Sequence, residues 1–140
     1  MILLDTNVMS EPLRQAPESR VIEWIDAQPM ETLFLSAITV AELRAGVALL
    51  PAGKRRAGLQ DNLEKRVLPL FAGRVLPFDL ACTPAYAALM AKGRSAGPTI
   101  ATADGYIAAI AVANNFAVAT RDTGPFEAAG VTVINPWVAM

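Results

Sequence analysis

Short apolar segments alternate with longer helical patterns along most of this 140-residue chain. The apolar segments have the length and composition of buried strands, and they are 2–4, 33–36, 75–78, 116–119 and 131–134. The segments that favour helices are 18–27, 39–50, 54–68, 83–93 and 101–114. Such alternation is typical of a parallel sheet with helices on both faces. We therefore predict an α/β fold, a three-layer α/β/α arrangement with a central, mostly parallel sheet, in one domain spanning 1–140.

Proline and glycine set several of the expected boundaries. Pro77 cannot donate a hydrogen bond to a neighbouring strand, which favours an edge position for the segment 75–78. Thr83 followed by Pro84 is a good helix start, and Gly93 is the expected end of that helix. The segment 93–99 is then expected to be a loop.

The composition excludes several classes of protein. Hydrophobic residues make up 54% of the chain and charged residues 18%, which excludes a disordered segment. A net charge of -1 argues against broad nonspecific affinity for nucleic acid, although a local basic surface stays possible. A single cysteine, no signal-peptide pattern and no apolar run near 20 residues favour a cytoplasmic protein without a membrane segment.

Four acidic residues are expected at one edge of the sheet. Asp5 directly follows the first strand, and Asp122 follows the strand 116–119. Glu42 lies about one turn into the helix after the second strand, and Asp104 lies in the first turn of the helix 101–114. In parallel sheets these helices begin at the carboxyl edge, where ligands bind, so all four acids can face one pocket.

Each acid also has a purely structural explanation. Thr39 to Glu42 matches a capping box, and an acid such as Asp104 in a first helical turn is favoured by the helix dipole. Asp5 can cap a short helix, and Asp122 begins an ordinary turn sequence. Helix capping, however, does not require four elements to converge at one edge.

Convergence of carboxylates has an energetic consequence. Two carboxylates ~4 Å apart repel each other by roughly 4 kcal/mol at an effective dielectric constant near 20. Such a cluster takes up protons, pairs with a neighbouring cation or binds a metal. The chain contains no histidine, and oxygen ligands alone favour Mg²⁺ or Mn²⁺ over zinc. Such ions are typical of phosphodiester hydrolysis.

The acidic motifs resemble those of the PIN domain. More narrowly, they are similar to the VapC and FitB branch of toxin–antitoxin ribonucleases. The similarity runs nearly end to end and rests on Leu4-Asp5-Thr6-Asn7-Val8 with Ser10-Glu11, Ala41-Glu42-Leu43-Arg44 with Gly46, Asp104 with Ile107-Ala108-Ala109, and Ala119-Thr120-Arg121-Asp122.

The resemblance implies a metal-dependent endoribonuclease. Asp5, Glu42, Asp104 and Asp122 would bind Mg²⁺ or Mn²⁺ and cleave RNA, with Thr6 and Thr120 as supporting hydroxyl groups. Family members often carry Thr-Arg-Asn, two further residues and then Asp-Phe. Here Asp122 stands in the Asn position and Pro125 in the later Asp position, so the role of Asp122 is open.

The resemblance also implies protein partners. It implies a toxin homodimer and a cognate antitoxin that fills the acidic site, commonly with a basic side chain. DNA would be contacted only through the antitoxin. The RNA target, the antitoxin and the number of metal ions are not specified by the sequence.

Three further hypotheses remain open from the sequence. A haloacid dehalogenase-like phosphatase also places Asp after a first strand, but its second Asp is Asn7 here. A noncatalytic receiver-like domain needs a Lys after a C-terminal strand, which this chain lacks. For RNA binding, six basic residues form a candidate surface, which otherwise is a solvated helix face: Lys54, Arg55, Arg56, Lys65, Arg66 and Arg74.

Overall fold

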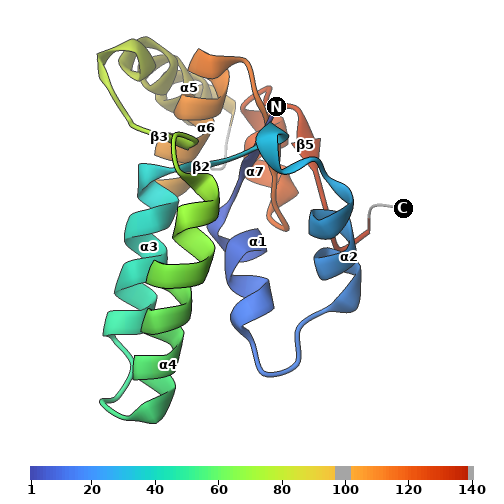
Figure 1. The fold of residues 1–140 in the computed structure, drawn as a ribbon. Helices are drawn as coiled ribbons and strands as arrows, with labels where there is room; N and C mark the ends of the chain where they lie inside the picture. Colours follow the sequence, from blue (N-terminus) through green and yellow to red (C-terminus); the bar gives the residue numbers. More distant parts are fainter. Residues whose placement is uncertain (97–101, 139–140) are drawn as a thin grey trace.

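The computed structural model describes residues 1–96 and 102–138, and its centre is a sheet of short strands (Figure 1). The strands are β1 (Ile2–Leu4), β2 (Leu33–Ser36), β3 (Val75–Leu76), β4 (Ala117–Ala119) and β5 (Val133–Ile134). Their order is β3-β2-β1-β4-β5, and all four pairings are parallel. The predicted parallel α/β fold is therefore confirmed, with β3 at an edge as Pro77 indicated.

Seven α-helices connect and cover these strands in the described part of the chain. They are α1 (Thr6–Ser10), α2 (Ser19–Ala27), α3 (Ala37–Ala48), α4 (Lys54–Asn62), α5 (Thr83–Ala96), α6 (Thr102–Asn114) and α7 (Thr123–Ala128). Shorter helical turns are η1 (Glu11–Leu13), η2 (Met30–Thr32), η3 (Leu63–Val67), η4 (Leu68–Phe71) and η5 (Leu80–Cys82). No described helix is long and apolar enough to cross a membrane.

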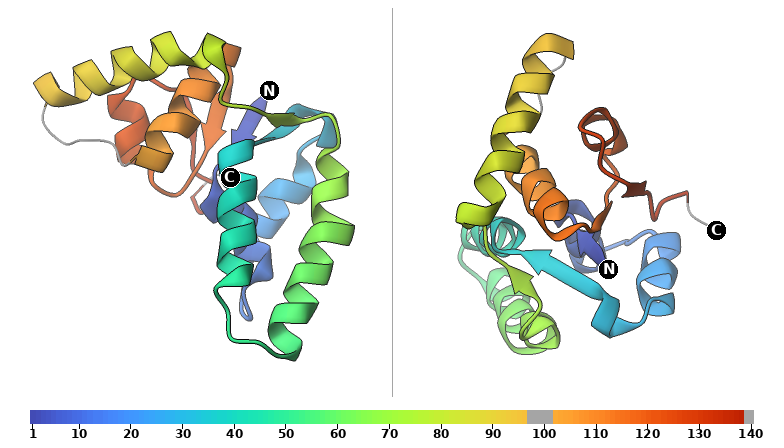
Figure 2. Two further views of the ribbon diagram at one scale, coloured as in Figure 1. Left: turned by 90° about the vertical axis from the view of Figure 1, so that its left-hand side faces the viewer. Right: turned by 90° about the horizontal axis from the view of Figure 1, so that it is seen from above.

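The sheet separates two apolar cores, because successive strand residues point to opposite faces. Leu3 packs with α5, α6 and α7, whereas its neighbour Leu4 packs with α1, α2, α3 and η3. Figure 2 shows α5 and α6 on one side of the strands and the α3–α4 pair with α2 on the other. This is the expected three-layer arrangement.

Several predicted boundaries were wrong by a few residues. Helix α3 begins at Ala37 rather than Thr39, because the buried Ser36 hydroxyl caps it by accepting from the Thr39 amide. Helix α5 continues past Gly93 to Ala96, and the rest of the predicted loop lies outside the described residues. A single glycine inside a helix costs only about 0.5–1 kcal/mol, so flanking helix formers outweigh it.

One further helix end and one strand start differ from the prediction, whereas α6 ends at Asn114 as predicted. The helix that begins at Lys54 does not stop at the predicted Leu68, because a π-helical turn and a 3-10 turn continue it to Phe71. At the end of α6, Asn115 has a φ of 58°, a left-handed conformation typical of a helix C-terminus. Phe116 therefore belongs to the connection and the next strand begins at Ala117.

Candidate functional site

The carboxyl edge of the sheet gathers the ends of its central strands. Strands β2 and β3 lie on one side of β1, and the later strands β4 and β5 lie on its other side. The crevice between β1 and β4 is thus the point where the strand order reverses, which is where ligands bind in such sheets. Asp5 directly follows β1 in this crevice, and its amide donates to the Ala119 carbonyl of β4 over 2.9 Å.

Asp5 is the buried member of the acidic set. Its side chain is 3% exposed, and hydrogen bonds hold both of its carboxylate oxygens. The Thr6 amide donates to Oδ1 over 2.8 Å, so Asp5 does cap the short helix α1. The Thr120 hydroxyl donates to Oδ2 over 2.7 Å. No second hydrogen bond from a described residue reaches either oxygen, which leaves a lone pair on each, because a carboxylate has about four acceptor positions in total.

The pKa of Asp5 is raised although these two hydrogen bonds lower it. Burial is the largest cause, because it disfavours the charged form. The negative charges of Glu42 and Asp122 raise the pKa further. These two acids therefore lie close enough to Asp5 to repel its charge.

Glu42 faces Asp5 from the second turn of α3. Its Oε1 accepts a hydrogen bond from the Thr6 hydroxyl over 2.6 Å, and the same hydroxyl lies 3.0 Å from Thr39 Oγ1. Helix α3 is capped by Ser36 instead, and the Thr39 amide donates to the Ser36 hydroxyl rather than to Glu42. The capping-box alternative for Thr39 to Glu42 is therefore wrong.

Asp104 completes the acidic edge from the first turn of α6. The pKa of its half-buried carboxyl is raised to about 6, first by burial and then by the negative charges of Asp5, Asp122 and Glu42. Those three charges act on one side chain, which means that the fold brings all four predicted acids into one electrostatic environment.

Asp122 is exposed and lies at the N-cap position of α7. Its side chain makes no capping hydrogen bond, and its amide donates to the Thr120 hydroxyl over 3.0 Å. The carboxylate is therefore not engaged in holding the helix, and the turn itself is held through Thr120.

The candidate ligands at this edge offer only oxygen donors, which hard divalent cations prefer. All four candidate ligands are carboxylates. No Lys or Arg among the described residues lowers the pKa of Asp5 or Asp104. Within the same described residues, no three metal-ligating side chains are gathered closely enough to hold an ion by themselves.

The contacts of the Asn7 side chain were not predicted from the sequence. The Asn7 side chain contacts both Thr120 and the Arg121 amide at the end of β4, each over 3.3 Å. Only the fold reveals these contacts, because the partners lie 113 and 114 residues apart in the sequence.

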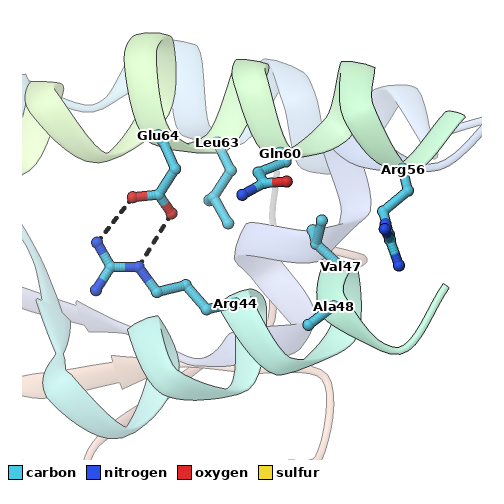
Figure 3. Close-up of a pocket in the computed structure, with 7 residues that line it drawn as sticks. All are labelled: Arg44, Val47, Ala48, Arg56, Gln60, Leu63 and Glu64. Atoms are coloured by element: carbon cyan, nitrogen blue, oxygen red, sulfur yellow. Dashed lines mark hydrogen bonds and ion pairs between the residues drawn. The ribbon is translucent and has the colours of Figure 1, made fainter. Parts of the chain in front are cut away.

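A separate groove lies between α3 and the helix that runs from α4 into η3 (Figure 3). Its volume is ≈ 520 Å³, and it is lined by Arg44, Val47, Ala48, Arg56, Gln60, Leu63 and Glu64. Arg44 donates two hydrogen bonds, of 3.0 and 2.8 Å, to the two oxygens of Glu64. None of the four candidate acids lines this groove, so it is distinct from the acidic edge.

Comparison with known proteins identifies a family match over most of the chain. The PIN domain model matches residues 2–131. VapC ribonuclease Y4jK of Sinorhizobium fredii is 63% identical over 137 residues, 98% of each chain. Toxin FitB of Neisseria gonorrhoeae is 57% identical over 137 residues, 98% of this chain and 99% of FitB. The crystal structure of FitAcB from Neisseria gonorrhoeae has a TM-score of 0.96 at 56% identity, covering 99% of this chain and 100% of that one.

Proposed function

The chain belongs to the PIN-domain family, and we propose that it is a metal-dependent endoribonuclease, the toxin of a type II toxin–antitoxin pair. The observation that carries this proposal is that Asp5, Glu42 and Asp122 all repel the Asp104 carboxylate at one sheet edge, in a chain 63% identical to a VapC ribonuclease. RNA phosphodiester bonds would be hydrolysed there. The residues proposed for catalysis and metal binding are Asp5, Glu42, Asp104 and Asp122.

We propose Mg²⁺ or Mn²⁺ as the cofactor because the donors are all oxygen atoms. A bound ion of this kind stabilises negative charge on the phosphate and lowers the pKa of water. Asp5 and Asp104, the acids with raised pKa values, would be the principal ligands, with Glu42 and Asp122 completing the set. A cation would offset the repulsion that, after burial, raises the pKa of Asp104.

The supporting residues hold the carboxylates in place. Thr120 and the Thr6 amide fix the two oxygens of Asp5, and the Thr6 hydroxyl orients Glu42 toward the same space. Asp122 is exposed, so its charge is accessible to solvent. The chain therefore supplies a fixed inner acid and more accessible outer acids.

The test is cleavage of structured RNAs by the purified protein with Mg²⁺ or with EDTA. We expect cleavage with Mg²⁺ that leaves 5′-phosphate and 3′-hydroxyl ends, and none in EDTA or in Asp5→Asn. Asp79→Asn is the matched control, since Asp79 also lies just beyond a strand but contacts Cys82 instead of the acidic edge. Cleavage that persists in EDTA or in Asp5→Asn would contradict the proposal.

We also propose a cognate antitoxin and a toxin homodimer as partners. A basic side chain from the antitoxin would neutralise the acidic edge in the way a cation does. Large apolar side chains are exposed elsewhere, among them Leu49 and Leu80, each 85% exposed, and association would cover such surface. Light scattering on the purified chain tests the dimer, and inhibition of cleavage by the product of a neighbouring short gene tests the antitoxin.

The alternatives of a haloacid dehalogenase-like phosphatase and of a receiver-like signalling domain gain no support from the geometry. Asn7, which stands where a phosphatase of the haloacid dehalogenase type has its second Asp, is bonded to Thr120 and the Arg121 amide. No lysine among the described residues contributes to the pKa of Asp5 or Asp104, as a receiver-like site would require.

A further inference from the structure

Asn7 joins the end of β1 to the end of β4 through its side-chain amide. It lies in the first turn of α1, two residues after Asp5. Its Oδ1 accepts a hydrogen bond from the Arg121 amide, and its Nδ2 donates one to Thr120 Oγ1. The reverse orientation would place the NH₂ group against the Arg121 N–H, two donors facing each other. The surroundings therefore fix which way the amide points.

Thr120 uses its whole hydrogen-bonding capacity at this position. A hydroxyl has one proton to donate and two lone pairs that accept. The Asn7 NH₂ group and the Asp122 amide donate to Oγ1 over 3.3 and 3.0 Å. With both lone pairs engaged, the single proton is directed to Asp5 Oδ2, 2.7 Å away. The side chain is completely buried, so water does not compete for these bonds.

We propose that Asn7 is a positioning residue that acts through Thr120 to hold the Asp5 carboxylate in its working orientation. The catalytic consequence rests on the proposed ribonuclease function, whereas the chain of hydrogen bonds does not. With the Thr6 amide fixing the other oxygen, loss of the Thr120 bond leaves Asp5 attached on one side only. Asn7 itself touches neither Asp5 nor the other three acids through any hydrogen bond in the described structure.

A double-mutant cycle tests this coupling. The variants are Asn7→Ala, Thr120→Val and the combination of the two, each measured for RNA cleavage and for the pKa of Asp5 by carboxyl ¹³C NMR without metal. We expect Asn7→Ala to lower kcat about tenfold, because releasing the Thr120 hydroxyl from Asn7 weakens its hydrogen bond to the charged Asp5, and to leave KM nearly unchanged. The pKa of Asp5 should rise, because the Thr120 bond favours its charged form.

The combined variant decides whether Asn7 acts through Thr120. Once Thr120→Val has removed the hydroxyl, adding Asn7→Ala should change neither kcat nor the pKa of Asp5 any further. Thr120→Ser should retain the wild-type values, because it keeps the hydroxyl. Asn114→Ala is the matched control, since it removes a side-chain hydrogen bond to the Ile110 carbonyl at the far end of α6.

Two results would overturn the inference. One is full additivity of the two substitutions, and the other is an unchanged pKa of Asp5 in Asn7→Ala. If Asn7→Ala does not fold, Asn7→Ser replaces it in the cycle. If the wild-type protein cleaves no RNA while the NMR cycle shows the expected coupling, the proposed function fails and the positioning role of Asn7 stands.

Discussion

Opposing effects act on the pKa of the Asp5 carboxyl. Burial and two nearby carboxylates disfavour the ionised form of Asp5, while two hydrogen bonds favour it. The effects that disfavour ionisation are larger, so the pKa of Asp5 is raised. Arranging like charges in this way costs stability. A buried acid repelled by its neighbours is a common sign of a functional site, since folding alone gives no reason to retain it.

Asp104 allows this cost to be measured. Its folded-state pKa of about 6 lies above the ordinary value of 3.8, so the folded protein binds more protons than the unfolded chain between these two values. Stability should therefore be greatest below about pH 4 with respect to this group, and should fall as the pH rises through 6. Asp104→Asn removes the charge and should raise Tm at pH 8 by about 3–5 °C in metal-free buffer.

Thermal melts from pH 4.5 to 8 check this prediction. Asp104→Asn should show a flatter dependence of Tm on pH, with the remaining slope due partly to Asp5, whose pKa is raised as well. Asp26→Asn, on the exposed face of α2, is the control and should match wild type. An unchanged slope in Asp104→Asn would mean that neither burial nor repulsion raises the pKa of its carboxyl.

Asp122 separates a catalytic from a structural role. Because its side chain makes no cap bond to α7, Asp122→Asn should leave Tm unchanged or slightly higher. RNA cleavage should fall about 10- to 100-fold if the charge belongs to the metal site. Paired measurements of Tm and cleavage rate are sufficient. A lower Tm with unaltered cleavage would restore the turn-and-cap explanation.

At the level of elements, the sequence predicted types better than ends. Val and Leu runs identified the strands because a buried parallel strand is apolar on both faces. Ends depended on single polar contacts, such as the Ser36 cap, or on a π-helical turn after Asn62, neither of which follows from periodicity. The four acids could be placed because strand ends locate the binding edge, whereas Asn7 could not, because its partners are distant in the sequence.

Glu11 gives an element-scale prediction about the connection from α1 to α2. Its buried carboxylate accepts a hydrogen bond from the Glu18 amide over 2.8 Å, and Arg14 lies 3.2 Å away. Glu11→Ala should lower the free energy of unfolding by about 2 kcal/mol, because it leaves the Glu18 amide without this acceptor. Arg14→Ala should have a much smaller effect, because the Arg14 side chain is 61% exposed.

The pH dependence of this effect has the opposite sign to that of Asp104. The pKa of Glu11 is lowered, first by the Glu18 amide, so its contribution is present above the ordinary value of 4.5 and is lost as the pH falls. Urea unfolding at pH 7 and pH 3 should therefore show a difference between wild type and Glu11→Ala that shrinks at pH 3. An equal difference at both values would rule out the ionised carboxylate as the cause.

At the scale of the whole molecule, the net charge of -1 does not show which basic side chains are available to a ligand. Of the six basic residues considered for RNA binding, three have internal partners. Arg74 donates to the Leu33 and Leu70 carbonyls, Arg56 donates to the Leu50 carbonyl, and Lys65 pairs with Asp61 at 2.7 Å. In the described chain, the side chains of Lys54, Arg55 and Arg66 make no hydrogen bond or ion pair, and the first two residues begin α4 at the tip of the α3–α4 hairpin (Figure 1).

Lys54 and Arg55 are therefore the residues most available to RNA phosphates. The variant with both changed to Ala should bind RNA more weakly, and the slope of log affinity against log salt should flatten by about 0.7 for each phosphate that is no longer neutralised. Fluorescence anisotropy with a labelled RNA and Asp5→Asn protein, across a salt series, measures both quantities without cleavage. Lys65→Ala is the control, because its ammonium is already paired with Asp61. An unchanged slope in the double variant would place RNA binding elsewhere on the molecule, since the salt dependence reports how many phosphates the protein's cations neutralise.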